Sequence, residues 1–588
     1  MRSRVFWLLF LLSLLTASHG AYLNDSRDQA AGLHALSEGS LRLSDGYGHL
    51  YYQGGNLSQQ ERRTDGVPVG STVLNVVALP MDLALSGVDH VIPFAVLLAF
   101  LVPVALAKTL SVSPWNDRLR DGHQLALLFL LAAVGYFLTG RLSKTPDLDL
   151  WHPFIALQAT NIALFLLAAW RFHKLLSRHV DLRWAHIVTL ATFAGSLLFW
   201  APTMKYHVLS ALLVVLMLEV SERTGPRARI LLGILAGLAF ATNLGSGAVA
   251  VVAVGAWTTW RVLRKRWPAA AMWHVPAGGL VGMLPFFIEN LLLFGNPLTS
   301  FYQVPQGTNA TVGAERTGWF AQYALGWESP LAWLEGISSV FVTGIAVEGS
   351  PLGVFHIQPL LIAAVVGSWL GRRHASARLA ALLLLLQAIV MLRPSLLQGD
   401  GVDVRLWTNV LPAMGLLAGL ALAKARAPSP KGVAAWAIGS LTLAVAFLAL
   451  LDLLDVGYTD QHSKGEHIRT YLNLIGIFWG LVALMGLVLW RTLMGDRDRS
   501  TWMAGTAIGV TAVWVFTFMI LSHTGLSPYQ GDEEHTHWLD GVGQASDWMF
   551  YRLLPEYPLP IVYNEDGSLA FHPDHGRCDD PGVSCPDP

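Results

Sequence analysis

Two carboxylates, Asp25 and Asp28, follow the first apolar segment of the chain directly, and their type and spacing suit chemistry. Residues three apart share one face of a helix, so the pair would hold one acceptor hydroxyl or one metal ion between them. The alternative is structural, with Asp25 capping the next helix and Asp28 solvated. We treat both as candidate catalytic residues.

Four further side chains suit the binding of an anionic or polar substrate. Lys205 and His207 lie in a turn between two apolar runs, and Glu289 lies one or two turns inside the end of another. Arg405 stands where a polar loop enters an apolar run, and its guanidinium suits a phosphate or pyrophosphate. The alternatives are an interfacial aromatic belt with a snorkelling lysine, a helix-neighbour pair for Glu289, and a headgroup-level Arg405 without a specific ligand.

The elements that must position these residues are membrane helices. The chain has 588 residues, of which 53% are hydrophobic and 13% charged, whereas soluble domains carry about 25% charged residues. Apolar runs fall near 5–18, 91–107, 122–140, 153–172, 185–200, 206–221, 229–243, 246–260, 273–294, 353–370, 376–393, 405–423, 432–454, 470–490 and 501–522. Their length predicts an all-α polytopic membrane protein with about 13–15 transmembrane helices. Residues 72–85 and 331–342 are typical of interfacial helices.

The distribution of lysine and arginine predicts the topology. Alternate loops are basic, namely 108–120, 171–183, 223–229, 261–266, 372–378, 424–431 and 491–499. Because basic loops stay in the cytoplasm, the N-terminus is predicted there and the C-terminus outside. The sequons at Asn24, Asn56 and Asn309 all fall in loops assigned outside, and they are possible glycosylation sites.

Two segments leave alternatives open. The short first apolar run ends at Ala17–Ala21, so it is either a cleaved signal peptide or an uncleaved first helix, which we favour. The tail after Ser522 is rich in Pro, Gly and Asp and is interpreted as ordered loop or partial disorder. It holds the only two cysteines, Cys578 and Cys585, which suit a disulfide if the tail lies on an oxidising face.

Composition and motifs also exclude some classes. The net charge of −1 gives no bulk attraction to nucleic acid, so no nucleic-acid partner is expected. No P-loop, HExxH or GxSxG motif occurs in a credible context, so coupling to ATP is unsupported.

The order of several segments resembles the GT-C superfamily of integral-membrane glycosyltransferases, in its protein mannosyltransferase-like and aminoarabinose-transferase-like branch. The segments are Asp25, Ala35–Leu41, Gly48–Tyr52, Val67–Gly70 with Leu79–Pro80, Lys205–Leu212, Glu289–Pro297, Glu348–Leu361 and Val404–Leu406. The resemblance runs to about residue 424. It departs at 64–68, where one proline, Pro68, replaces a lysine followed by paired prolines.

The resemblance implies transfer of a sugar from a polyprenyl-phosphate donor to a protein, lipid or glycan acceptor on the extracytoplasmic face. Asp25 would act as the base, and the basic groups would stabilise the departing lipid phosphate. Tyr52, within the Gly48–Tyr52 segment, joins Lys205, His207, Glu289 and Arg405 as a substrate-binding residue. The lipid-linked sugar is then a co-substrate, membrane lipids are partners, and a divalent metal is an open question.

The predicted organisation has three parts. Residues 1–424 form the GT-C-like module, with a first outer loop at 21–90 and a long outer loop at 295–352. Residues 425–522 add C-terminal transmembrane helices, and 523–588 form an extracytoplasmic polar tail. Two other functions stay open: a multi-span transporter or flippase for lipids or amphiphiles, and a catalytically inactive protein with this fold. A transporter would need charged residues at mid-membrane on several helices, and the apolar runs are mostly free of them.

Overall fold

A computed structural model gives the fold. It describes residues 2–15, 24–42, 70–86, 151–201, 205–298, 354–391, 407–453, 499–524, 562–563, 569–572 and 576–577. The chain divides into two compact units, Met1–Arg171 with Leu198–Gly326 and Phe172–Leu197 with Trp327–Pro588. The predicted division at residues 424 and 522 stays a prediction.

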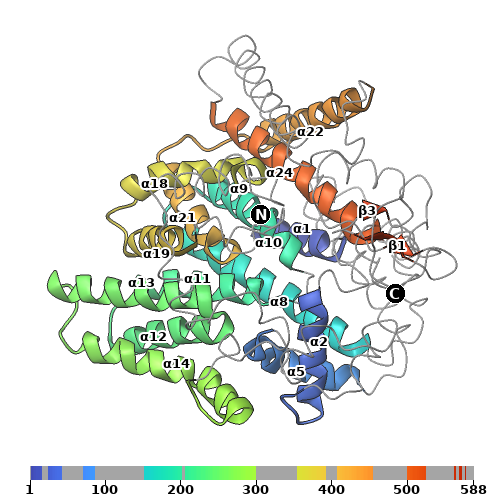
Figure 1. The fold of residues 1–588 in the computed structure, drawn as a ribbon. Helices are drawn as coiled ribbons and strands as arrows, with labels where there is room; N and C mark the ends of the chain where they lie inside the picture. Colours follow the sequence, from blue (N-terminus) through green and yellow to red (C-terminus); the bar gives the residue numbers. More distant parts are fainter. Residues whose placement is uncertain are drawn as a thin grey trace, which may run out of the picture. The chain divides into compact units, whose positions relative to one another are not determined.

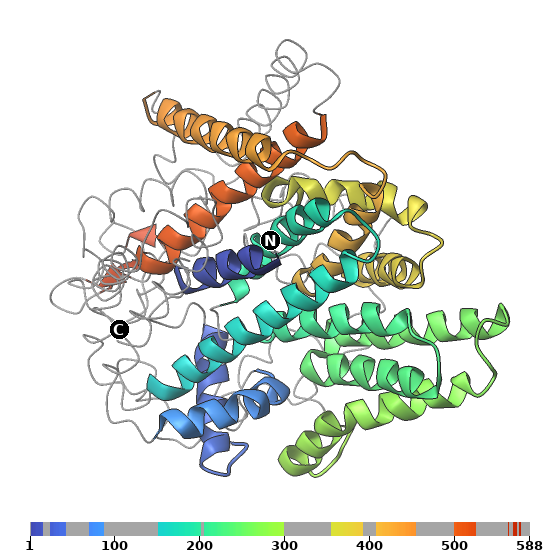
Figure 2. The same cartoon turned by 180° about the vertical axis from the view of Figure 1, so that it is seen from behind.

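The first unit is built from helices α1 (Arg2–Leu15), α2 (Asn24–Ser37), α5 (Thr72–Leu85), most of α8 (Trp151–Leu176), α11 (His207–Ser221), α12 (Pro226–Thr242), α13 (Leu244–Leu263) and α14 (Ala271–Phe294). Figures 1 and 2 show α12, α13 and α14 side by side, and α5 lies near the end of α14. Pro226 opens α12, where its missing N–H costs nothing. Asn243 ends α12 and caps α13, accepting hydrogen bonds from the N–H groups of Gly245 and Ser246.

The second unit contains α9 (Leu182–Phe193), α17 (Val354–Ile357), η5 (Pro359–Ala363), α18 (Ala364–Leu370), α19 (Ala375–Met391), η6 (Thr408–Val410), α21 (Leu411–Ala421), α22 (Pro430–Leu453) and α24 (Arg499–Thr524). Helix α21 packs against α9, α18 and α19, and α22 packs against α24 (Figure 1). Trp184, Phe193 and Trp407 are fully buried here. The short helix α10 (Ser196–Trp200) straddles the boundary between the units.

The predicted fold class, an all-α polytopic membrane protein, is confirmed. Among the described residues, α13 and α14 are long and apolar enough to cross a membrane, and the pair 359–370 and 375–390, bent by 119°, counts as a third span if it is taken as one. The total of about 13–15 spans stays a prediction. Several predicted runs, such as 91–107, 122–140 and 470–490, lie outside the described residues.

Two predicted single runs are broken in the structure. The run at 185–200 is divided into α9 and α10, and the run at 353–370 into α17, η5 and α18. One side chain joins the two breaks: Gln358, fully buried just before Pro359 at the start of η5, donates from Nε2 to the carbonyls of Ala191 and Thr192, 2.8 Å from each. These carbonyls lie at the end of α9, where a helix leaves its last carbonyls without backbone partners.

Part of the tail is strand and not loop, and for the rest of residues 525–588, which lie outside the described part of the chain, the interpretation stays a prediction. Short strands β1 (Val562–Tyr563), β2 (Leu569–His572) and β3 (Gly576–Arg577) form an antiparallel sheet in the order β1-β2-β3. Val562, Tyr563 and Phe571 are β-branched or aromatic residues, which favour strands. The Pro, Gly and Asp residues around them favour turns, and the interpretation of the tail followed those residues.

Candidate functional site

Helix α2 is fastened to the start of α5 by one buried glutamine. The Gln29 side chain donates from Nε2 to the carbonyl of Ser71 over 3.1 Å and accepts from the Ser71 N–H over 2.8 Å. Its amide also meets that of Asn75, and Ser71 caps α5 through the N–H of Leu74. A glutamine amide offers one donor group and one acceptor, so it can pair with the C=O and the N–H of a single residue, as the backbone of a neighbouring strand does. The start of α5 therefore depends on α2.

The first turn of α5 also meets α14. The hydroxyl of Thr72 donates to Oε1 of Glu289 over 2.6 Å. Glu289 lies one turn before the end of α14, which stops at Gly295 with a φ of 69°. An ionised carboxylate in an apolar helix is costly unless a polar group pairs with it, and Thr72 supplies that group. We call Gln29, Ser71, Thr72, Asn75 and Glu289 the α2–α5–α14 junction.

The segment after α2 reaches the same end of α14. Gly39 has a φ of 81°, a conformation that only glycine adopts without strain, and it turns the chain after the helix. Arg42 then donates from Nη2 to the carbonyl of Leu293 over 2.5 Å. Three segments distant in sequence therefore meet around Glu289.

Lys205 and His207 are brought together around Trp200. The Lys205 ammonium lies 5.6 Å from the centre of the Trp200 ring, and the His207 ring lies 4.1 Å from it. Asn161 on α8 donates to the carbonyl of Lys205 over 2.9 Å and holds the turn. Both side chains are buried, at 4% and 5% exposure, so Lys205 does not extend outward as a snorkelling lysine would.

Asp25 and Asp28 both lie in α2, so the helical arrangement on which their shared face depends is present. The backbone places Asp25 one turn before Gln29, on the helix face that Gln29 occupies. The side chains of Asn24, Asp25 and Asp28 are outside the described part of the chain. The roles of both carboxylates stay predictions.

Several predicted residues lie outside the described ranges altogether. They are Tyr52, Arg405, Asn56, Asn309, Cys578 and Cys585. The substrate-binding, glycosylation and disulfide assignments for them stay predictions. Within the described residues, no group of three or more His, Cys, Asp or Glu could hold a metal ion.

The sequence analysis missed five residues of this region: Gln29, Ser71, Thr72, Asn75 and Asp82. Asp82 is fully buried and is the one charged residue of α5. The signal was available, because a carboxylate in an otherwise apolar helix marks a polar interior. Helix α5 has the predicted bounds, but Asn75 and Asp82 lie on its buried side, whereas Val76, Val77, Met81 and Leu83 are exposed. Its interfacial position stays a prediction.

Replacing Gln29 with leucine should detach the start of α5. The Ser71 N–H and carbonyl would lose their partner, at a cost of roughly 1–3 kcal/mol for each stranded group. The check is the thermal stability of the purified protein in detergent. The control is Ser37→Ala on the same helix, since among the described residues its hydroxyl bonds to the helix's own His34 carbonyl. If both variants have the same melting temperature, Gln29 does not fasten α5.

Comparisons with known proteins give few matches. No protein-family model matches the sequence, and no curated protein matches it. The fold is similar to two solved structures of ArnT from Cupriavidus metallidurans. The structure bound to undecaprenyl phosphate is 15% identical, with 88% of this chain and 76% of that chain covered and a TM-score of 0.43. The apo structure is 14% identical, with 88% and 75% covered and a TM-score of 0.44.

Proposed function

We propose that the protein is a membrane glycosyltransferase that transfers a sugar from a polyprenyl-phosphate donor to a protein, lipid or glycan acceptor. The proposal follows from the ordered resemblance of the sequence to GT-C enzymes. Asp25 would take the proton of the acceptor hydroxyl, and the hydroxyl oxygen would displace the lipid phosphate in a single inverting step. Lys205, His207 and Arg405 would stabilise the phosphate that leaves.

The observation that carries the proposal is the α2–α5–α14 junction. It places polar groups of α5 and α14 beside α2, the helix of Asp25. Glu289, which the resemblance also selects, accepts from Thr72 there. Burying a polar or ionisable side chain in a membrane helix costs free energy. Such side chains therefore most often mark a substrate path.

The buried pair Lys205 and His207 supports the second half of the reaction. A phosphate leaving group needs positive charge in a site with little water, where electrostatic attraction is strongest. Lys205 is 4% exposed and rests on the Trp200 ring, so its ammonium is held in one place. Fixed charge of this kind needs no reorganisation as the phosphate departs.

The described spans give the transporter alternative little support. Helix α13 carries one charged residue, Arg261, in its last turn. Helix α14 carries Glu289 one turn before its end. Coupling-ion or substrate sites of transporters lie near the membrane midplane, which these two helices leave apolar.

The test is transfer of labelled sugar from a polyprenyl-phosphate donor in membranes that contain the protein. Asp25→Asn should lower the rate by about 10²–10⁴-fold, the usual contribution of a general base. Asp28→Asn should lower it less. Asp181→Asn makes the same chemical change at an exposed helix cap of the second unit, where asparagine caps equally well, and it should leave the rate unchanged.

The amount of folded protein is measured for each variant beside the rate. Full activity in Asp25→Asn would show that this carboxylate is not the base. No transfer by the wild-type protein with any polyprenyl-phosphate sugar, together with movement of lipid between leaflets, would favour the transporter instead.

A further inference from the structure

Helix α11 begins without a side-chain cap, directly after Lys205. Its N-cap is Tyr206, whose side chain makes no capping hydrogen bond. The N–H of Ser210 donates to the Tyr206 carbonyl over 2.9 Å, whereas within the part of the chain that the structure describes the N–H groups of Val208 and Leu209 have no acceptor. Unpaired N–H groups and the helix dipole make such an end attractive to an anion.

A buried serine in the first turn of α11 points to a ligand at this end. Ser210 is 5% exposed, and among the described residues its hydroxyl has no hydrogen-bond partner. Hydroxyls inside helices commonly bond a carbonyl of the preceding turn, as those of Thr189 and Thr258 do over 2.6 and 2.7 Å. Because the Cα–Cβ bond of a helical residue tilts toward the N-terminus, the Ser210 hydroxyl lies over the first turn.

Lys205 and His207 lie at the same end of α11 and are held by contacts of their own. Both lie against the Trp200 ring, and Asn161 donates to the Lys205 carbonyl. The donors that remain for a ligand are therefore the Ser210 hydroxyl and the two backbone N–H groups. Donors of this kind, close together on one helical turn, suit the oxygens of a phosphate group.

We propose that the start of α11 binds a phosphate group, with the Ser210 hydroxyl and the N–H groups of Val208 and Leu209 as its donors. The inference rests on the proposed function, under which this phosphate belongs to the polyprenyl lipid carrier. The backbone donors are fixed by the helix, so they need no reorganisation when the sugar leaves and the phosphate gains charge. Ser210 is then a phosphate-binding residue in addition to Lys205 and His207.

The experiment measures ligand binding to the purified full-length protein in detergent by native mass spectrometry. The ligands are a polyprenyl phosphate, the polyprenol without phosphate, and inorganic phosphate. Wild-type protein should prefer the polyprenyl phosphate to the other two. Ser210→Ala should weaken polyprenyl-phosphate binding about tenfold or more, the usual effect of losing a hydrogen bond to a charged group, and should leave polyprenol binding unchanged.

Ser221→Ala is the matched control on the same helix. Ser221 is also fully buried, but its hydroxyl donates to the Leu218 carbonyl of its own helix over 2.7 Å. This variant should bind all three ligands as the wild type does. Ser210→Ala removes a buried hydroxyl that has no partner, so the melting temperature without ligand should stay the same or rise. Weaker binding in that variant is then not a loss of folding.

A second variant, Ser210→Cys, keeps the side-chain shape and supplies only a weak donor, so it should weaken polyprenyl-phosphate binding in the same direction. Equal binding by the wild type and Ser210→Ala, or no preference over the polyprenol, would overturn the proposal. Inorganic phosphate that binds as tightly would overturn the choice of a lipid as the ligand. Binding that depends on Ser210 in a protein that transfers no sugar would support this site and contradict the proposed transferase activity alone.

Discussion

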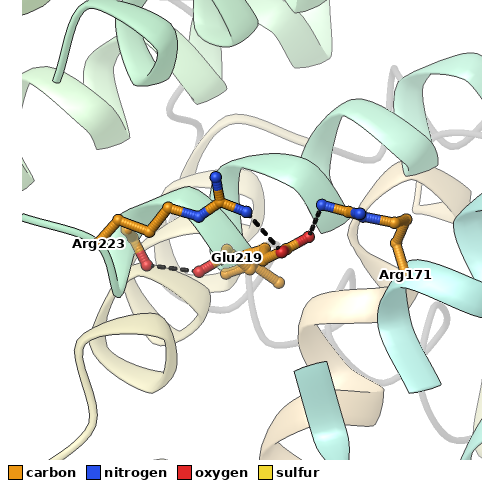
Figure 3. A network of polar contacts seen from close by, with 5 residues as sticks. Arg171, Glu219 and Arg223 are labelled. Carbon is orange, nitrogen blue, oxygen red and sulfur yellow. Dashed lines mark hydrogen bonds and ion pairs between the residues drawn. The ribbon is translucent and has the colours of Figure 1, made fainter. Parts of the chain in front are cut away.

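Replacing Glu219 with leucine should lower the stability of the first unit by about 3–5 kcal/mol, the usual cost of breaking a buried ion pair on one side. Glu219 is 1% exposed on α11. Its Oε2 lies 2.5 Å from Nη2 of Arg171 on α8, and its Oε1 lies 2.8 Å from Nη2 of Arg223 (Figure 3). Without the carboxylate, Arg171 would keep a largely buried charge with no counter-ion in this network.

The two arginines should not be equivalent, and this gives the matched control. Arg223 is 50% exposed and pairs with Glu219 one turn earlier on the same chain segment, so water can replace its partner. Exposed pairs of this spacing contribute about 0.3–0.5 kcal/mol, and Arg223→Ala should cost no more. Arg171 is 22% exposed and joins a different helix, so Arg171→Leu should cost several times as much.

The double variant Arg171→Leu with Glu219→Leu should recover part of the loss, because apolar side chains then replace both buried charges. The measurement is unfolding in detergent micelles, followed by circular dichroism. A cost of Glu219→Leu as small as that of Arg223→Ala would mean that the carboxylate does not join α8 to α11.

The helices were predictable wherever an apolar run ends at charged residues, glycine or proline. Helix α14 was expected over 273–294 and spans Ala271–Phe294, since basic residues precede it and Gly295 ends it. The end of α9 was not predictable, because the Gln358 amide that bonds its last carbonyls is more than 160 residues away, whereas Pro359 at the start of η5 is a local signal for the second break. A local pattern carries no information on such a partner.

The candidate site likewise contains residues that the local sequence reveals and residues that it does not. Glu289 could be found because a carboxylate is conspicuous in an apolar run. Its partner Thr72 could not, since a threonine at the start of a helix also serves as an ordinary cap and the pair is 217 residues apart. Glu219 also lies in a predicted apolar run, 206–221, but its pairing with Arg171 of another helix is visible only in the structure.

Replacing Gly237 with leucine should separate α12 from α14 and should cost about 3 kcal/mol or more, at or above the top of the usual overpacking range. A Cβ at Gly237 would overlap the carbonyl of Gly279 and come within 2.9 Å of Gly282 Cα. From the other side, a Cβ at Gly278 would overlap the carbonyl of Ile230. The obstacle is backbone on both helices, which cannot rotate away as a side chain can.

The glycine at 255 on α13 provides the matched control. It is exposed, and a Cβ there meets nothing within 4 Å. Gly255→Ala should therefore raise stability by about 0.5–1 kcal/mol, because alanine loses less backbone entropy in a helix. Thermal unfolding of both variants in one detergent compares them directly. Since small residues let membrane helices approach closely, a Gly237→Leu protein that melts with the wild type would mean that α12 and α14 do not pack backbone to backbone.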